Sequence, residues 1–139
     1  MQTWLRLGGI GMLLFLVLGS VVPPAAAADG AAGPRVKVVN LEPGDSPYLM
    51  LLDGPPETAS LRSGLVTLAP GTSIGKHNTE NYEEVLVPLE GEGELRIPGQ
   101  PPVRIRSGLI TYAPTHTEHD VANTGTTRLR YIFLVARAE

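Results

Sequence analysis

Closely spaced turn residues are the feature that most restricts how this chain can fold. Gly and Pro, of which the sequence has 16 and 13, interrupt it at short and fairly regular intervals after residue 34. Such spacing excludes long helices, because Pro breaks a helix interior and Gly favours turns. We expect short strands at residues 35–41, 48–52, 60–71, 82–91, 93–99, 102–108, 109–114, 118–125 and 128–136. This pattern predicts an all-β sandwich or barrel.

Alternation of apolar and polar residues supports two of these strands. Val103 and Ile105 share one face, and Arg104 and Arg106 share the other. Successive side chains of a strand point to opposite faces, so we expect the arginines to face solvent. The last strand divides in the same way, with one face formed by Leu129, Tyr131, Phe133 and Val135. The glycines around residue 91 indicate a hairpin.

The N-terminal stretch is typical of a secretory signal peptide, which we place at residues 1–28. One basic residue, Arg6, precedes an apolar run, and Ala26-Ala27-Ala28 stand directly before Asp29. The uninterrupted apolar core, Ile10 to Val22, is short for a membrane span, which needs about 20 residues. An uncleaved anchor is the alternative, and the length favours cleavage. We therefore expect an exported protein, periplasmic or secreted, with no stable membrane insertion after cleavage.

The rest of the chain is long enough for one domain with one core. We expect a flexible lead-in at residues 29–34 and a single domain at 35–139. The net charge is −3, and the chain has no basic stripe, so nucleic acid is not an expected partner. The chain has no Cys, which excludes disulfides and a lipidated cysteine anchor.

The three histidines and one glutamate carry most of the chemical information. His77 and Thr79 share one face if the chain is extended there, and Glu84 opens an apolar strand. The neighbouring Glu83 has the opposite parity and is expected to point outward. His119 is four residues before an Asn, so the two side chains can face one interior. Two imidazoles and a carboxylate suit a divalent transition metal and leave coordination positions open.

The spacing of these residues resembles the two motifs of the cupin family. The first motif falls on Gly71, His77, Thr79, Glu84 and Gly91, within residues 71–91. The second falls on Gly108, Pro114, His116, His119 and Asn123, within residues 108–123. The resemblance covers about residues 60 to 136. It implies that residues 35–139 form a cupin jelly-roll β-barrel, and it implies a homodimer.

The resemblance also implies a metal site. Cupins usually hold a metal through two His and one Glu of the first motif and one His of the second. Here these roles carry over to His77, Glu84 and His119 only, because Thr79 replaces the second His. The divalent ion, whether Fe, Mn, Zn, Ni or Cu, is left open. His116, which stands where the motif has Gly, would join the ligands only if the turn before it redirects its side chain; otherwise it lies at the rim or in solvent.

Several functions are compatible with this pattern. One is a metal-dependent enzyme, such as a dioxygenase or isomerase acting on a small molecule. The alternative is a non-enzymatic module that binds or senses a small ligand, such as a sugar or carboxylate, with a degenerate metal site. A structural protein that kept only the fold is a third. No residue is assigned a catalytic role, and no organic cofactor site is predicted, since nucleotide-binding motifs are absent from the sequence. Three tyrosines are placed either in the core or at a barrel mouth: Tyr82, Tyr112 and Tyr131.

Overall fold

The computed structural model describes residues 33–42, 44 and 46–138. Within these residues the chain forms strands and no helix, as the turn spacing predicts. Nothing helical in this part of the chain is long and apolar enough to cross a bilayer. The predicted signal peptide, residues 1–28, and most of the predicted lead-in lie outside the described residues.

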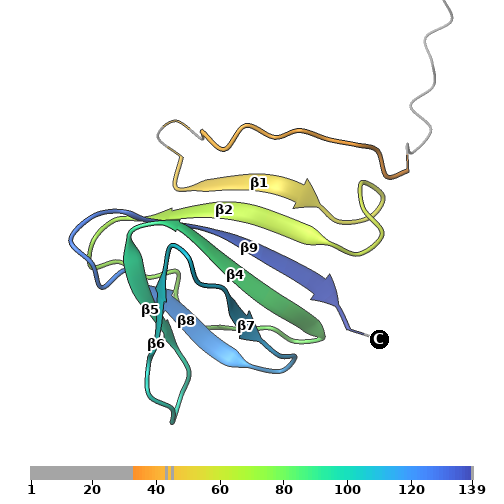
Figure 1. Cartoon of the computed structure of the whole chain (residues 1–139). Coiled ribbons are helices and arrows are strands. Elements are labelled where there is room, and N and C mark those ends of the chain that lie inside the picture. The colour runs from red at the N-terminus through yellow and green to blue at the C-terminus, as the bar shows by residue number, and fades with distance from the viewer. Residues whose placement is uncertain (1–32, 43, 45, 139) are drawn as a thin grey trace, which may run out of the picture.

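Nine strands form two antiparallel sheets (Figure 1). The five-stranded sheet has the order β1-β2-β9-β4-β7, and the four-stranded sheet has the order β3-β8-β5-β6. Their bounds are β1 Tyr48–Asp53, β2 Arg62–Leu68, β3 His77–Asn78, β4 Tyr82–Glu90, β5 Glu92–Arg96, β6 Val103–Arg106, β7 Thr111–Ala113, β8 Glu118–Ala122 and β9 Leu129–Arg137. Strands distant in sequence are therefore neighbours, and most contacts that hold the fold are long-range.

The core lies between the two sheets and receives side chains from both. It consists of Val66, Leu68, Leu86, Leu95, Ile105, Val121, Leu129 and Tyr131. In β6 the arginines are exposed as predicted and Ile105 is completely buried, but Val103, on the same face as Ile105, is 42% exposed. In β9, Leu129 and Tyr131 are buried on the expected face. Burial of this apolar face is the main force that joins the sheets.

The predicted hairpin at Gly91 is wrong. Strand β4 pairs with β7 and β9, whereas β5 pairs with β6 and β8, so the chain crosses from one sheet to the other at this residue. Gly91 has a left-handed backbone with φ +75°, and a Cβ there would overlap the carbonyl oxygen of Arg128. Glycine is required because the crossing needs both this conformation and close backbone approach.

The predicted strand at residues 35–41 is also wrong. The segment lies outside both sheets and makes no ladder hydrogen bonds. Val36 and Val38, which alternate as in a strand, are 101% and 95% exposed and bury no apolar face. A side-chain bond from the Lys37 ammonium to the Leu51 carbonyl oxygen, 3.0 Å, holds the segment near β1 instead. Alternation alone does not make a strand where no second strand offers hydrogen-bonding partners.

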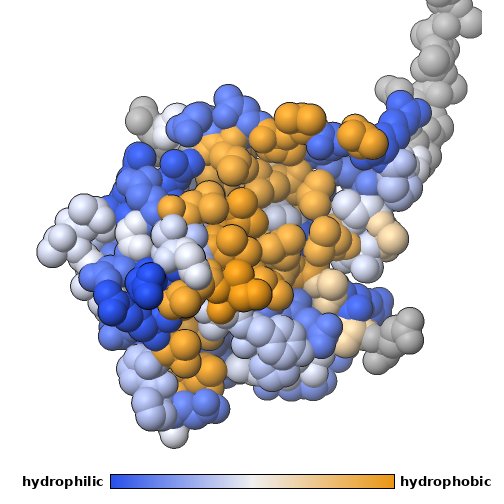
Figure 2. Space-filling model, in the orientation of Figure 1, coloured by the Kyte–Doolittle hydropathy of each residue, from blue (hydrophilic) through white to orange (hydrophobic). Residues whose placement is uncertain are grey.

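Apolar residues also gather on the surface. Figure 2 shows them spread over the area of β1, β2, β9 and β4. In β4 the buried residues Glu84, Leu86 and Pro88 face inward, so Val85 and Val87 face outward and are half-buried. The outer face of the five-stranded sheet is thus less polar than that of a fully solvated sheet.

Candidate metal centre

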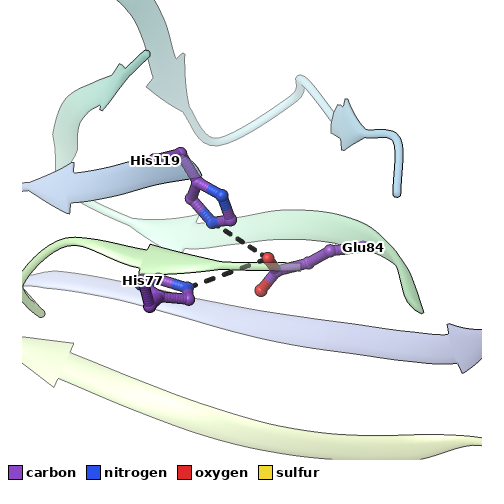
Figure 3. A group of neighbouring side chains, drawn as sticks. All are labelled: His77, Glu84 and His119. Atoms are coloured by element: carbon purple, nitrogen blue, oxygen red, sulfur yellow. Dashed lines mark ion pairs between the residues drawn. The ribbon is translucent and has the colours of Figure 1, made fainter. Parts of the chain in front are cut away.

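Three side chains capable of binding a metal converge from three strands and both sheets. His77 on β3 and His119 on β8 are direct register partners in the four-stranded sheet. Glu84 reaches them from β4 in the facing sheet. One ligand atom from each residue lies within 4.8 Å of the others (Figure 3). The two motifs are therefore brought to one place by the packing of the sheets.

The two imidazoles approach the same carboxylate oxygen. His119 Nε2 lies 2.9 Å from Glu84 Oε2, and His77 Nε2 lies 4.0 Å from it (Figure 3). The two rings are 4.2 Å apart between centroids, at an angle of 60°. The space between the three side chains is thus bordered by two ring nitrogens and one carboxylate oxygen.

Backbone hydrogen bonds determine which nitrogen each ring presents. His77 Nδ1 lies 3.0 Å from the carbonyl oxygen of Gly75, and His119 Nδ1 lies 3.2 Å from that of Thr117. A carbonyl oxygen only accepts, so Nδ1 carries the proton in both rings, and in the neutral rings Nε2 has a free lone pair. This is the arrangement in which a second partner orients a metal-binding histidine.

His119 Nε2 lacks a partner among the described atoms. The side chain is completely buried, and its unprotonated Nε2 has no hydrogen-bond partner, although Glu84 Oε2 lies 2.9 Å away. Two lone pairs at this distance repel each other unless a cation lies near both. Burial alone would lower the pKa of His119, but the Glu84 carboxylate and the Thr117 carbonyl outweigh it and raise the pKa. The residues present therefore fit a bound cation.

Thr79 has a structural contact instead of a free ligand atom. Its hydroxyl donates to the Pro114 carbonyl oxygen at 2.7 Å and accepts from the Thr117 backbone N–H at 2.9 Å. The side chain is buried. It therefore ties the end of β3 to the segment before β8, the same segment whose Thr117 carbonyl orients His119.

His116 does not join the cluster of ligand atoms. It is exposed, and the turn after Pro114 leaves it outside the group formed by His77, Glu84 and His119. Its backbone has φ +56°, a left-handed conformation that Gly adopts without strain. The left-handed backbone at this position explains why the family motif has Gly here. His116 adopts the same conformation at some cost in conformational strain.

The predicted outward orientation of Glu83 is confirmed. Its carboxylate is exposed and accepts a hydrogen bond of 2.6 Å from the hydroxyl of Tyr112. Tyr112 consequently lies on the outside of the sheet and not at the mouth of the barrel. Tyr82 and Tyr131 do line the cavity beside the cluster. Burial, and then the charges of Glu84 and Asp120, raise the pKa of Tyr131, so its hydroxyl stays protonated.

A cavity of about 340 Å³ opens beside His77 and Glu84. Its lining consists of Tyr48, Arg62, Val66, Ile74, His77, Asn78, Thr79, Tyr82, Glu84, Val121, Tyr131, Phe133 and Val135. Arg62, Asn78 and Phe133 were not singled out from the sequence. The alternation along β9 could have indicated Phe133 as a lining residue, since Tyr131, Phe133 and Val135 share one face.

Comparison with known proteins identifies the family. Residues 64–135 match the family model described as the Cupin domain. The chain belongs to the cupin family. A cupin with a double-stranded β-helix fold from Methanocaldococcus jannaschii superposes with a TM-score of 0.60 at 20% identity, over 76% of this chain and 94% of that one. At this identity the likeness concerns the fold alone.

Two matches from Thermotoga maritima, one curated sequence and one solved structure, share more sequence identity with this chain. One, named oxalate-binding protein, is 32% identical over 68 residues, which are 49% of this cupin and 55% of the relative. The other, a solved structure described as a predicted oxalate decarboxylase, is 29% identical with a TM-score of 0.51, over 55% of this chain and 65% of that one. The cupin thus spans little more than half of the curated relative.

Proposed function

We propose that this cupin binds one divalent transition metal ion through His77, Glu84 and His119. The observation that carries the proposal is the buried Nε2 of His119, which has no hydrogen bond and lies 2.9 Å from a carboxylate oxygen. Protein interiors rarely leave such an atom unpaired. Two imidazoles and one carboxylate are a common ligand set for Zn and Fe.

We propose that the metal holds a small carboxylate. When bound, the metal would supply Lewis acidity and open positions for an oxygen donor. The chain supplies the rest: His77 and Glu84 border the cavity, and the Tyr131 hydroxyl remains available as a hydrogen-bond donor. The name of the oxalate-binding relative supports a carboxylate as the ligand class.

Calorimetry with oxalate tests this function. Protein loaded with Mn²⁺, Zn²⁺ or Ni²⁺ should bind oxalate at one site per chain, and the same protein stripped by chelator should not. Glu84→Gln keeps the shape of the side chain but removes its charge, so it should weaken metal retention and, with it, oxalate binding. Glu83→Gln, on the outward neighbour, is the matched control and should change neither. Equal oxalate binding with and without metal would contradict the proposal.

Catalysis is the second candidate function. The cavity beside the cluster has room for a substrate, and one relative is described as a predicted oxalate decarboxylase. A dioxygenase or isomerase would use the same open positions. Metal-dependent release of CO₂ from oxalate, lost in His119→Ala, would support the enzyme. If the protein binds oxalate but releases no CO₂ under air or under nitrogen, the non-enzymatic binding function is supported instead.

We also propose export, with residues 1–28 removed and residues 35–139 forming one domain. Support comes from the sequence, and mass spectrometry of the protein recovered from the periplasm or medium would test it: a mature chain starting near Asp29 is expected, and a full-length chain in the membrane fraction would contradict it. A homodimer is proposed from the half-buried outer residues of the five-stranded sheet and from its edge strand β7, which has a strand neighbour on one side only. Light scattering after gel filtration should give twice the chain mass.

A further inference from the structure

We propose that the preferred ligand of this cavity is an elongated anion with two ends, and that Arg62 binds the end remote from the metal. This inference rests on the proposed metal-dependent binding function. One end, an oxygen donor, would lie at His77, Glu84 and His119. The other, a carboxylate, would lie at Arg62, and an apolar spacer of about four carbons would lie between them.

The register of the five-stranded sheet sets how far apart the backbones lie that carry the two ends. Arg62 on β2 pairs with Val135 on β9, and Val135 pairs with Glu84 on β4. The three residues therefore form one row across the sheet, and all three line the cavity. Neighbouring strands are about 4.8 Å apart, so the backbones of Arg62 and Glu84 are separated by about 10 Å.

The floor between the two ends is apolar and rigidly packed. Val66, Phe133 and Val135 line it. The ring of Phe133 lies directly against Gly64, where a Cβ would be 2.6 Å from its Cε1 atom. The ring also stacks with Tyr48, with centroids 6.1 Å apart and an angle of 24° between planes. A surface of this kind suits methylene or aromatic groups, and among the described lining residues Arg62 is the one cationic side chain beyond it that can pair with a second carboxylate.

Arg62 can exchange its present partner, Asp53, for an anion. It is the one Lys or Arg among the described residues that line the cavity. Its contact with Asp53 is long, 3.4 Å, and both side chains are largely exposed. Exposed pairs of this kind contribute little and are readily exchanged. The planar guanidinium can donate two parallel hydrogen bonds to a carboxylate.

Oxalate matches only one end of this cavity. Its two carboxyl carbons are joined by a single bond of about 1.5 Å, which is much shorter than the separation of about 10 Å between the backbones of Arg62 and Glu84. A cavity of about 340 Å³ lies in the range that accommodates considerably larger ligands. The carboxyl carbons of adipate, at about 6 Å in the extended form, come much closer to the required span.

Competition between three carboxylates tests the inference. Calorimetry on the metal-loaded protein would compare adipate, hexanoate and oxalate, with metal content measured on the same samples. We expect adipate to bind at least tenfold more tightly than hexanoate. Arg62→Met keeps the apolar stem but removes the charge, so it should weaken adipate about tenfold and leave hexanoate and oxalate unchanged. Arg62→Lys should restore part of the difference.

The outcomes separate this inference from the proposed function. Arg104→Met, on an exposed arginine away from the cavity, is the matched control and should leave all three affinities unchanged. Metal-loaded protein that binds adipate no better than hexanoate, or Arg62→Met protein that retains full adipate affinity, would overturn the two-ended ligand and leave the metal site standing. Protein that holds no metal would overturn both.

Discussion

Replacing Thr79 with Val tests whether this position is structural. The substitution keeps the shape of the side chain and removes a buried hydroxyl that donates to Pro114 and accepts from the Thr117 N–H. A neutral hydrogen bond contributes about 1 kcal/mol net, and a buried group left unsatisfied costs about 1–3 kcal/mol. We therefore expect the free energy of unfolding to fall by about 2–3 kcal/mol.

Urea denaturation of the metal-free protein, monitored by far-UV circular dichroism, would measure this loss. Thr72→Val is the matched control: its exposed hydroxyl makes one bond, to the Ala69 carbonyl at 2.8 Å, and its removal should cost less than about 0.5 kcal/mol. A second consequence concerns the metal, since Thr117 orients His119. Thr79→Val should also weaken metal binding by about tenfold or more. A variant as stable as the wild type, with unchanged metal affinity, would refute the structural role.

Three further predictions concern pH, chain crossing and the core. Glu84 raises the pKa of His119 above 6.5 despite the burial of the ring. The metal-free protein therefore gains stability from this group below about pH 6.5 and loses that stability as the pH rises through the folded pKa. Thermal denaturation of the wild type and of His119→Gln at several pH values should show this difference. With metal bound the trend should reverse, since the ion requires neutral imidazole. Gly91→Ala should destabilise by more than about 2 kcal/mol, whereas Gly99→Ala, with a similar φ but no atom near the new Cβ, should cost about 1 kcal/mol, both by urea titration. Leu129→Ala, at a completely buried position, should cost about 2–5 kcal/mol in the same assay, and a value under 1 kcal/mol would contradict the assigned core.

The sequence predicted the class of fold and the three candidate ligands, because both depend on spacing. Period-2 alternation requires only a pleated strand, so the burial of Ile105 and the exposure of Glu83 followed directly. Motif spacing related His77 and Glu84 to His119, and the structure brings these three side chains together. Their roles as metal ligands stay a prediction.

Sheet membership could not be predicted in the same way. The turn at Gly91 has the composition of a hairpin, but only the neighbours of β4 and β5 determine that it crosses between sheets. The two-residue strand at His77 was missed because its pairing with β8 is non-local. Residues 35–41 alternate like a strand, yet no partner pairs with them. Arg62 lines the cavity because β2 pairs with β9 and places it beside Val135. The sequence alone does not show that these two strands are neighbours.

Elemental analysis of the purified protein, prepared without chelator, tests the metal site most directly. Four proteins should be compared: the wild type, His77→Ala, His119→Ala and His116→Ala, the last being a control at an exposed histidine outside the cluster. We expect about one divalent transition metal per chain in the wild type and in His116→Ala, and little or none in the other two. A wild type that holds no metal even after soaking with several divalent ions, or a His119→Ala variant that keeps its full metal content, would contradict the site.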